Sequence, residues 1–369
     1  MAGSRAPLRY ASVALALAHW GMRRRKPGEP RRILVLHHLL LGDTLMLTGL
    51  LAKLRARYPQ AEIAMTVAPA YVALYEGRPY GVIAHALDPR DYGTLRRLRA
   101  LPRFDLAILP ADNRWSWLAR ALRIPWIVGI AGDRPAHKNW PVDELIPYSP
   151  VPTAFAETTA ELVDGTSAPP YCTDAWPAPP AHALPALPER YAVLHVGASS
   201  RLKMWPPERW RALAVAVEAR GLAVVWSAGP GEGAIIDAID PAGTRTRIAG
   251  TLPLAAMWHL LRGAKLLVCP DTGIAHLGRV VGVPTVTLFG PGSSVICGPG
   301  RFFADMPGRA VTVEPFACRD QTIQFFRDVA WARRCERLYG DGPLRCAHAR
   351  CMDAIDLAAV EAAVDELTG

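Results

Sequence analysis

The feature that most constrains the fold is an alternation of short apolar runs with helix-like stretches, which occurs twice along the chain. Strand-like runs of the first half lie at 33–39, 62–68, 82–87, 106–110 and 125–130. Those of the second half lie at 192–196, 223–227, 265–269 and 284–289. Helical patterns intervene, at 44–57, 207–219, 254–261 and 274–281. This alternation predicts an α/β protein with parallel sheets that helices cover on both faces.

A proline-rich segment separates the two halves, because residues 168–188 contain seven prolines. Such a composition is typical of a linker or of a long crossing between domains. With 369 residues, of which 51% are hydrophobic, the chain is long enough for two domains with large cores. We therefore predict a basic N-terminal arm (1–32), an N-terminal Rossmann-like domain (33–167), the linker, a C-terminal Rossmann-like domain with a cysteine-containing tail (189–352) and a C-terminal helix (353–369).

The formal net charge of +9 is concentrated at the N-terminus. Residues 1–32 hold eight basic residues and one acidic residue, so this arm carries +7 and the other 337 residues carry +2. A nearly neutral body argues against a nucleic-acid-binding protein. The apolar run at 10–18 is shorter than the roughly 20 residues that span a bilayer.

Dense positive charge follows that apolar run at Arg23, Arg24, Arg25 and Lys26, which favours retention in the cytoplasm. Two interpretations of the arm remain open. A basic, Leu- and Ala-rich segment that ends in Trp20 fits a helix on the anionic inner membrane surface, which would make the protein peripheral there. The alternative is a disordered tail without a partner.

In the first half, the candidate site is Leu41-Gly42-Asp43-Thr44, directly after the first predicted strand. In open α/β sheets, ligands bind at the ends of strands. Gly42 permits a tight turn that brings Asp43 to the mouth of the sheet. From the residues alone, Asp43 either caps the helix that begins at Thr44 or takes part in chemistry there.

Three candidate sites follow strands of the second half. The run 197–207 joins a glycine, the hydroxyls of Ser199 and Ser200, and Lys203, and is suited to phosphate oxygens or is an ordinary loop. Glu232 follows Gly229-Pro230-Gly231, which is either an ordinary turn or, because it lies at a strand end, a place where Glu232 binds a ribose. Asp271-Thr272-Gly273 begins a helix whose free amides attract a diphosphate, and His276 lies one turn further on.

Together these segments resemble glycosyltransferase family 9, the bacterial ADP-heptose:lipopolysaccharide heptosyltransferases. The resemblance rests on Leu41-Gly42-Asp43, on Gly197 to Ser200 with Lys203-Met204-Trp205-Pro206, on Asp271-Thr272-Gly273 with His276, and on Phe289-Gly290-Pro291. It implies the GT-B fold, in which two Rossmann-like domains face each other across a cleft. It also implies an inverting transfer, with the acceptor on the N-terminal side and the sugar nucleotide on the C-terminal side.

The resemblance further implies a role for each site residue and favours chemistry over capping for Asp43, which would be the general base. Lys203 would neutralise the leaving diphosphate, so no metal or other cofactor is required for the chemistry. The residues that would bind the donor are Ser199, Ser200, Glu232, Asp271, Thr272, Gly273 and His276, with His276 supporting the loop.

Two departures bear on the acceptor. His37-His38-Leu39-Leu40 replaces the basic and small polar residues that the family usually has before Leu-Gly-Asp, so the acceptor stays open between a glycolipid and a protein. The second departure is the basic arm, which the family core lacks.

The cysteines of the tail suggest a metal site. Seven cysteines, an odd number, argue against a disulfide framework. Four of them suffice for a tetrahedral ion, although their spacing lacks a Cys-x-x-Cys pair: Cys318, Cys335, Cys346 and Cys351. This tail is similar to that of a family branch that glycosylates autotransporter proteins and carries a four-cysteine iron site. We therefore weigh structural iron or zinc against reduced thiols.

The prediction is an inverting glycosyltransferase that transfers heptose from ADP-heptose to lipopolysaccharide core or a similar glycan. A protein O-heptosyltransferase with a four-cysteine metal site is the alternative within the enzyme class. A non-catalytic sugar-nucleotide-binding protein is the alternative outside it, and the presence of both Asp43 and Lys203 argues against it.

Overall fold

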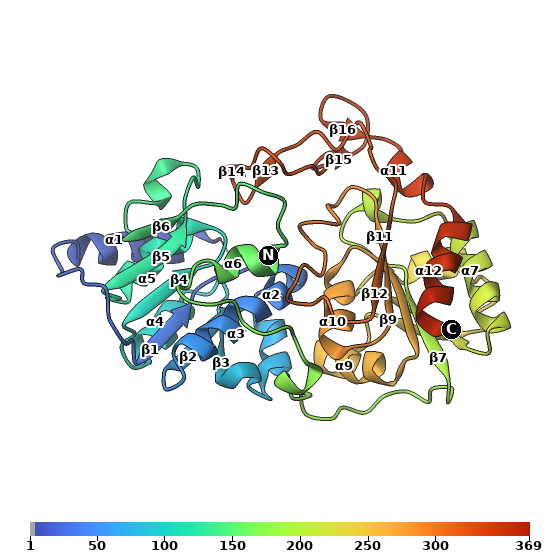
Figure 1. Ribbon diagram of the computed structural model, residues 1–369, viewed down its shortest axis with the longest axis horizontal. Coiled ribbons are helices and arrows are strands. Elements are labelled where there is room, and N and C mark those ends of the chain that lie inside the picture. Colours follow the sequence, from blue (N-terminus) through green and yellow to red (C-terminus); the bar gives the residue numbers. More distant parts are fainter. Residues whose placement is uncertain (1–3) are drawn as a thin grey trace. The chain divides into compact units, whose positions relative to one another are not determined.

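The computed structural model describes residues 4–369, which form two compact units (Figure 1). Unit 1 holds the chain up to Pro169 together with two returning segments, Ala175–Pro177 and Ile323–Trp331. Unit 2 holds Pro170–Asp174, Ala178–Thr322 and Ala332–Gly369. Each unit contains a six-stranded parallel sheet flanked by helices, so the predicted α/β class with two Rossmann-like domains is confirmed.

The sheet of unit 1 has the strand order β3-β2-β1-β4-β5-β6. Its strands are β1 (Arg32–Val35), β2 (Glu62–Val67), β3 (Val82–Ala86), β4 (Leu106–Leu109), β5 (Trp126–Ile130) and β6 (Glu144–Ile146). The register pairs Leu34 with Ala64 on one side and with Ala107 on the other. The order of the strands reverses between β1 and β4, and ligands of open α/β sheets bind where such a reversal occurs.

Six α-helices accompany this sheet within the described part of unit 1. They are α1 (Ala6–Ala18), α2 (Leu41–Met46), α3 (Thr48–Arg57), α4 (Gly93–Ala100), α5 (Ser116–Ala121) and α6 (Phe155–Ala160). The predicted helix at 44–57 is therefore divided into α2 and α3, with Leu47 between them. Because α2 begins at Leu41 with Leu40 as its N-cap residue, Asp43 lies inside the first turn and is not the cap.

The N-terminal arm is part of unit 1, because α1 packs against α5 and α4. Leu8, Ser12 and Ala16 recur every four residues and are buried on one face of α1, and Leu8 joins the core that surrounds Leu34. Residues 6–18 thus form a helix that packs on unit 1, and the interpretation of the arm as a disordered tail is wrong for these residues. Residues 1–3 of the arm lie outside the described residues.

Unit 2 repeats the same architecture, with the strand order β12-β11-β10-β7-β8-β9. Its strands are β7 (Tyr191–His195), β8 (Ala223–Ala228), β9 (Thr246–Ala249), β10 (Leu266–Pro270), β11 (Thr285–Phe289) and β12 (Gly308–Thr312). Its helices are α7 (Pro207–Ala219), α8 (Gly233–Ile239), α9 (Leu254–Gly263), α10 (Gly273–Val281), α11 (Arg350–Asp353) and α12 (Leu357–Thr368). Here the order reverses between β7 and β10, which carry the loops with Lys203 and Asp271.

The C-terminal helix belongs to the core of unit 2. Asp356 caps α12 by accepting a hydrogen bond from the Ala359 amide at 2.7 Å. Val360 and Val364 are fully buried in the cluster that also contains Trp210 and Trp226. The predicted boundary at residue 353 is therefore not a domain boundary in the structure.

The first part of the proline-rich segment is held by one contact in each unit. Tyr171 packs against Phe303 in unit 2, with ring centroids 5.1 Å apart. The Trp176 indole packs against Tyr75 in unit 1 and donates to the Leu74 carbonyl at 3.1 Å. The stretch that follows Pro177 leads into β7 and contacts unit 2 at its start, where the Pro179 carbonyl lies 2.9 Å from His259 Nε2.

One segment from the C-terminal part of the chain docks on unit 1. The strands β13 (Ile323–Gln324) and β14 (Arg327–Asp328) form a small hairpin, and Phe325 packs against Phe155 at 4.9 Å between ring centroids. The buried guanidinium of Arg327 donates to the Ile130 and Ala131 carbonyls at 3.0 and 2.8 Å. Residues 323–331 thus leave the predicted C-terminal domain (189–352) and complete the N-terminal one.

Candidate active site

The centre of the candidate site is an ion pair at the reversal point of the sheet in unit 2. Lys203 follows β7 and donates from Nζ to the Asp271 carboxylate Oδ2 at 3.0 Å and to the Asp271 carbonyl at 2.6 Å. Asp271 directly follows β10 and is buried. The structure therefore brings together two residues that are 68 positions apart in the chain.

The Asp271 carboxylate has room because residue 292 is a glycine. A Cβ atom at that position would lie 2.3 Å from Asp271 Oδ2. The sequence pattern Phe289-Gly290-Pro291 ended one residue short of this contact, so Gly292 is a site residue that our sequence analysis missed. The second glycine, which directly follows that motif, was the signal in the sequence that could have identified this position.

The N-terminus of α10 has the features of an anion site. Thr272 is the N-cap residue, and its buried Oγ1 has no hydrogen-bond partner among the described residues. Gly273 begins the helix, so the first amides, those of Gly273 and Ile274, have no partner within the helix, whereas the Ala275 amide donates to the Thr272 carbonyl at 3.1 Å. A buried hydroxyl beside free amides is suited to the oxygens of a phosphate group.

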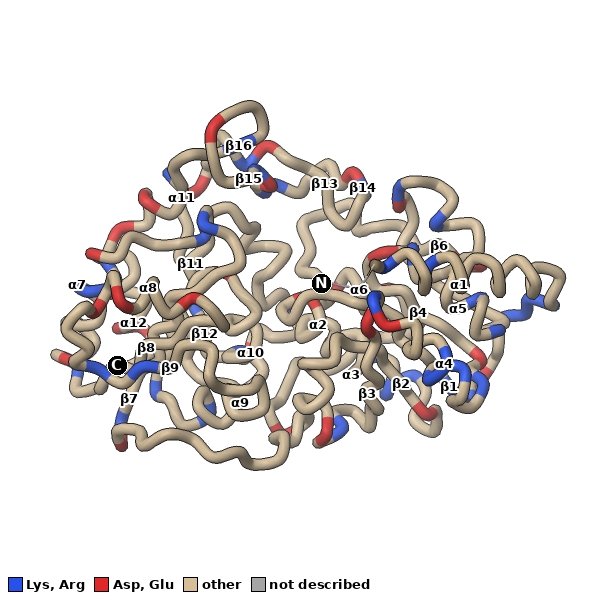
Figure 2. Tube along the Cα trace, turned by 180° about the vertical axis from the view of Figure 1, so that it is seen from behind, with Lys and Arg blue, Asp and Glu red and all other residues tan. Residues whose placement is uncertain are grey.

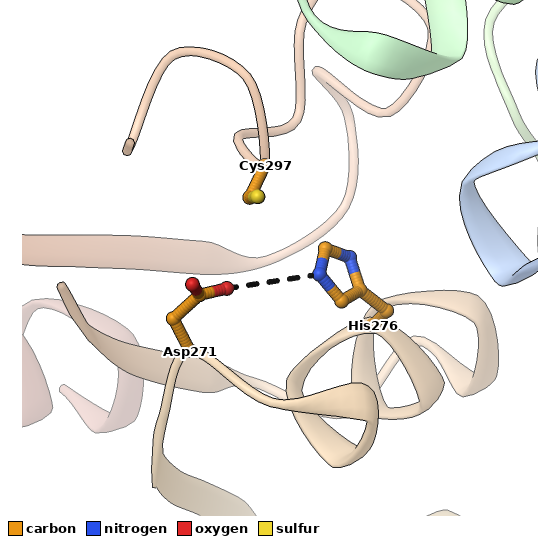
Figure 3. Close-up of side chains that lie close together, drawn as sticks. All are labelled: Asp271, His276 and Cys297. Atoms are coloured by element: carbon orange, nitrogen blue, oxygen red, sulfur yellow. Dashed lines mark ion pairs between the residues drawn. The ribbon is translucent and has the colours of Figure 1, made fainter. Parts of the chain in front are cut away.

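His276 lies one turn into α10 and is buried beside Asp271 (Figure 3). Its Nε2 is 3.9 Å from Asp271 Oδ1. Burial lowers the pKa of His276 to about 3, with Arg279 as a further cause, so the imidazole is neutral at physiological pH. Its expected role in supporting the loop stays a prediction.

Glu232 lies against the loop that follows β7. It is the N-cap residue of α8, and its Oε2 accepts a hydrogen bond from the Gly229 amide at 2.7 Å. The same oxygen would be 1.9 Å from a Cβ atom at position 197. Only a glycine at this position leaves the carboxylate in place.

Replacing Gly197 by alanine is therefore expected to displace the Glu232 carboxylate from the Gly229 amide, and the added Cβ would also lie 3.0 Å from the Gly229 backbone nitrogen. If Glu232 binds the ribose, nucleotide affinity falls about as much as in Glu232→Ala, by roughly five- to tenfold for one lost hydrogen bond. Calorimetric titration with ADP measures both variants. Full affinity in Gly197→Ala and in Glu232→Ala would exclude the ribose role.

The two serines differ in their surroundings. Ser200 Oγ accepts from the Leu202 amide at 3.3 Å and caps the 3-10 turn Arg201–Lys203. Ser199 is exposed. The structure thus gives Ser200 a local capping contact and leaves Ser199 accessible to a ligand.

The candidate base lies in unit 1. Asp43 is half-buried in the first turn of α2, and its negative charge adds to burial in raising the pKa of the Tyr71 phenol. The preceding His37 is buried, with Nδ1 accepting from the Leu39 amide at 3.3 Å. Burial lowers the pKa of His37 to about 3, so the imidazole near the start of α2 is neutral.

The four tail cysteines line one cavity of about 370 Å³ in unit 2. Burial raises the pKa of Cys351 to about 11, and the neighbouring thiols Cys318 and Cys335 act in the same direction. Cys346 donates from Sγ to the His348 carbonyl at 2.8 Å. The structure therefore gathers these four residues around one space, although not all of their sulfurs lie within 4.8 Å of one another.

The family model described as Glycosyltransferase family 9 (heptosyltransferase) matches residues 95–301, which is more than half of the chain. The chain belongs to glycosyltransferase family 9. The predicted family is thereby confirmed. The matched region includes Lys203, Glu232, Asp271 and His276.

A curated relative in this family is lipopolysaccharide heptosyltransferase 1 of Pseudomonas aeruginosa. It is 37% identical over 106 residues, which are 27% of this chain and 29% of the relative. The alignment thus spans less than a third of the relative's length.

Solved structures of family members share the fold. E. coli heptosyltransferase WaaC with ADP is 17% identical, with a TM-score of 0.66 over 91% of this chain and 99% of that chain. The iron-containing dodecameric glycosyltransferase TibC from enterotoxigenic E. coli is 16% identical, with a TM-score of 0.56 over 93% of this chain and 77% of that chain. At these identities the likeness concerns the fold, and it confirms the predicted GT-B class.

Proposed function

We propose that the protein is an inverting glycosyltransferase that transfers heptose from ADP-heptose to a glycan acceptor. The observation that carries this proposal is the Lys203–Asp271 pair beside the free N-terminus of α10. Membership of a heptosyltransferase family supports the sugar, and the WaaC structure with ADP supports the nucleotide.

In this proposal, unit 2 binds the donor and stabilises the leaving group. The ammonium of Lys203, the Thr272 hydroxyl and the amides of α10 supply positive charge to the diphosphate as its bond to the sugar breaks. Asp271 orients Lys203 and the sugar, and Glu232 accepts hydrogen bonds from the ribose. Ser199 adds a hydroxyl to the phosphate oxygens.

Asp43 of unit 1 is proposed as the general base. The acceptor hydroxyl attacks the anomeric carbon and releases its proton to the Asp43 carboxylate, while ADP departs from the opposite face of the sugar. A single displacement of this kind inverts the anomeric configuration. Burial lowers the pKa of the neighbouring His37 to about 3, so this imidazole is a weak base. Asp43 is the acidic residue in the first turn of α2.

The role of Lys203 predicts that Lys203→Met weakens ADP binding by about tenfold to a hundredfold, because charge-assisted hydrogen bonds to phosphate are lost. Methionine keeps most of the side-chain volume. Titration calorimetry measures the affinity, and Arg211→Met, an exposed cation on α7, is the matched control. Equal ADP affinity in Lys203→Met and the parent protein would contradict this donor site.

A protein acceptor is the second candidate, which the four-cysteine cavity favours. Thiolates are ligands for iron and zinc, and the four on this cavity match the ligand number of a tetrahedral ion, which would require the sulfurs of Cys318, Cys335, Cys346 and Cys351 to move closer together. Such an ion would be structural, with its charge offsetting the thiolates. The iron-containing TibC, which has the same fold, supports this comparison.

Metal analysis of protein purified under reducing conditions tests this second candidate. One iron or zinc per chain, lost in Cys351→Ser and kept in Cys172→Ser, would support it; Cys172 is an exposed cysteine outside the cavity. Metal-free parent protein with an intact fold would leave the glycan acceptor as the better proposal.

We further propose that the arm places the enzyme on an anionic membrane surface, where a lipid-linked acceptor lies. Among the described residues, no helix has the length and apolar character to cross a bilayer. Trp20 is 40% exposed and stacks on Trp117, and Trp140 is 62% exposed. Arg23 and Arg25 follow Trp20 closely in the sequence and are exposed. Figure 2 shows in blue where the lysines and arginines lie along the chain. Aromatic rings with basic neighbours suit the interface of an anionic bilayer.

Charge reversal at this surface is expected to release the protein from vesicles. Arg23→Glu with Arg25→Glu should weaken binding to phosphatidylserine-containing vesicles at low salt by at least about tenfold. Arg211→Glu with Arg262→Glu, two exposed cations of unit 2, is the matched control in the same cosedimentation assay. We choose point variants and not a deletion of the arm, because α1 contributes to the core of unit 1 and its removal would disturb the fold. Equal binding by both pairs would exclude the arm as a membrane anchor.

A further inference from the structure

The loop that follows β11 is held by the cysteine-containing tail of unit 2, residues 318–322 and 332–351. The guanidinium of Arg319 is buried and donates to two consecutive carbonyls of this loop. Its Nη2 lies 2.9 Å from the Phe289 oxygen, and its Nε lies 2.7 Å from the Gly290 oxygen. Arg319 therefore fixes the backbone at the point where the chain leaves the sheet.

The next two residues of the loop connect the tail with the donor site. The Pro291 carbonyl accepts from the Cys335 amide at 2.9 Å, so three consecutive carbonyls bind to the tail. A Cβ atom at Gly292 would lie 2.3 Å from Asp271 Oδ2. This is the oxygen that accepts from Lys203 Nζ at 3.0 Å. The loop after β11 thus lies against the oxygen through which Asp271 holds Lys203.

The loop that carries Lys203 also contacts the tail. Its residue Leu202 and Pro291 line the cavity that contains the four tail cysteines. The guanidinium of Arg201 lies over the Tyr339 ring, 5.2 Å from the centroid. Both loops of the ion pair therefore rest on the same part of the chain.

Arg319 is itself held firmly by neighbouring groups of unit 2. Its Nη1 donates to Glu314 Oε1 at 2.9 Å, and its Nη2 also donates to Thr312 Oγ1 at 3.0 Å. All three nitrogens of the guanidinium thus have protein partners. A planar group with its donors in a fixed fork is a stiff link between these partners.

We infer that Arg319 is a positioning residue for the sugar nucleotide. Through residues 289–292 it holds Asp271 and Lys203 in the arrangement that binds the diphosphate. The inference rests on the donor site proposed above. Because the three nitrogens of Arg319 already donate to protein groups, its effect on the donor is exerted through the loop.

Replacing Arg319 by methionine should weaken ADP binding by about tenfold, with unchanged stoichiometry, because the charge-assisted contacts of the donor site are misplaced. Arg319→Lys keeps the charge but loses the fork, and should bind ADP with intermediate affinity. Arg120→Met is the matched control, since this buried arginine of unit 1 also binds two carbonyls and a carboxylate, those of Ile124, Pro141 and Asp143. Calorimetry should show full ADP affinity in the control. Full affinity in folded Arg319→Met as well would overturn the inference.

A double-mutant cycle tests whether Arg319 acts through the loop. Gly292→Ala pushes a Cβ atom against Asp271 and should also weaken ADP binding by about tenfold. Because both changes act on one loop, the double variant should lose clearly less than the roughly hundredfold product of the two effects. Arg319→Met combined with Glu232→Ala should show the full product of the single effects. A full product for the Gly292 pair would overturn the inference, and Arg319→Lys replaces Arg319→Met in the cycle if the latter does not fold.

Hydrogen exchange gives a readout that needs no ligand. The Asp271 amide donates to the Leu288 carbonyl at 3.0 Å, and Arg319→Met should speed exchange at this amide and across residues 289–298. Unchanged protection there would overturn the inference. If the parent protein does not bind ADP at all, the proposed donor site fails, whereas the exchange data still decide whether Arg319 holds the loop.

Discussion

Replacing Asp43 by asparagine is expected to lower kcat for sugar transfer by about two to four orders of magnitude, which is the usual contribution of a general base. Asparagine has nearly the same shape as aspartate but cannot take the proton of the acceptor hydroxyl. Asp43 lies in the first turn of α2 and does not cap that helix, so the fold should tolerate the change. Steady-state release of ADP measures the rate.

Donor affinity is the internal control for this variant, because the groups proposed to bind the nucleotide belong to unit 2. ADP should bind to Asp43→Asn as tightly as to the parent. Glu157→Gln removes a comparable half-buried acid from the first turn of α6 and should keep full turnover. Undiminished turnover in Asp43→Asn would contradict the assignment of Asp43 as the general base.

The second large effect is expected from Arg327→Met, which should lower the free energy of unfolding of unit 1 by about 3 kcal/mol. The guanidinium is buried and lies 3.4 Å from Asp133, a carboxylate that is itself fully buried. Asp133 keeps its contact with Lys138 at 2.9 Å. The Ala131 carbonyl loses its donor from the hairpin, which adds the penalty of an unsatisfied acceptor, whereas the Ile130 carbonyl keeps its hydrogen bond from Asn113 Nδ2 at 2.8 Å.

Hydrogen exchange resolves this effect by unit and should show the hairpin and the end of β5 losing protection together. Arg309→Met, which removes an exposed ion pair with Glu366 in unit 2, is the control and should change stability by less than about 1 kcal/mol. If Arg327→Met and Arg309→Met had the same small effect, the hairpin would not be an integral part of unit 1.

The strand positions could be predicted because central parallel strands are buried on both faces. β7, β10 and β11 are buried throughout, so each is a mainly apolar run in the sequence. The strands β6, β9 and β12 escaped prediction. Each lies at the edge of its sheet, where exposed and charged positions such as Arg247 and Arg309 interrupt the apolar pattern.

The arm and the hairpin show what local patterns leave open. The basic charge of the arm gave no sign that Leu8 and Ala16 would enter the core of unit 1, because a short helix face is recognisable only with its partner present. Likewise, Arg327 lies almost 200 residues from the carbonyls it binds. Contacts of this range arise from the topology and have no counterpart in sequence spacing.

The site could be predicted loop by loop, but its connections could not. Lys203 and Asp271 were each predicted because each follows a strand, whereas their ion pair depends on β7 and β10 being neighbours. The importance of Gly292 also depends on a tertiary contact, because only the position of the loop after β11 beside Asp271 shows why a side chain is excluded there.

The most direct test of the account is a panel of ADP-, UDP- and GDP-linked sugars, with release of each nucleotide followed in the presence of a heptose-free glycolipid acceptor. The account predicts release of ADP from ADP-heptose that depends on the acceptor and on Asp43. A preference for a UDP- or GDP-sugar, or turnover that Asp43→Asn leaves unchanged, would contradict it.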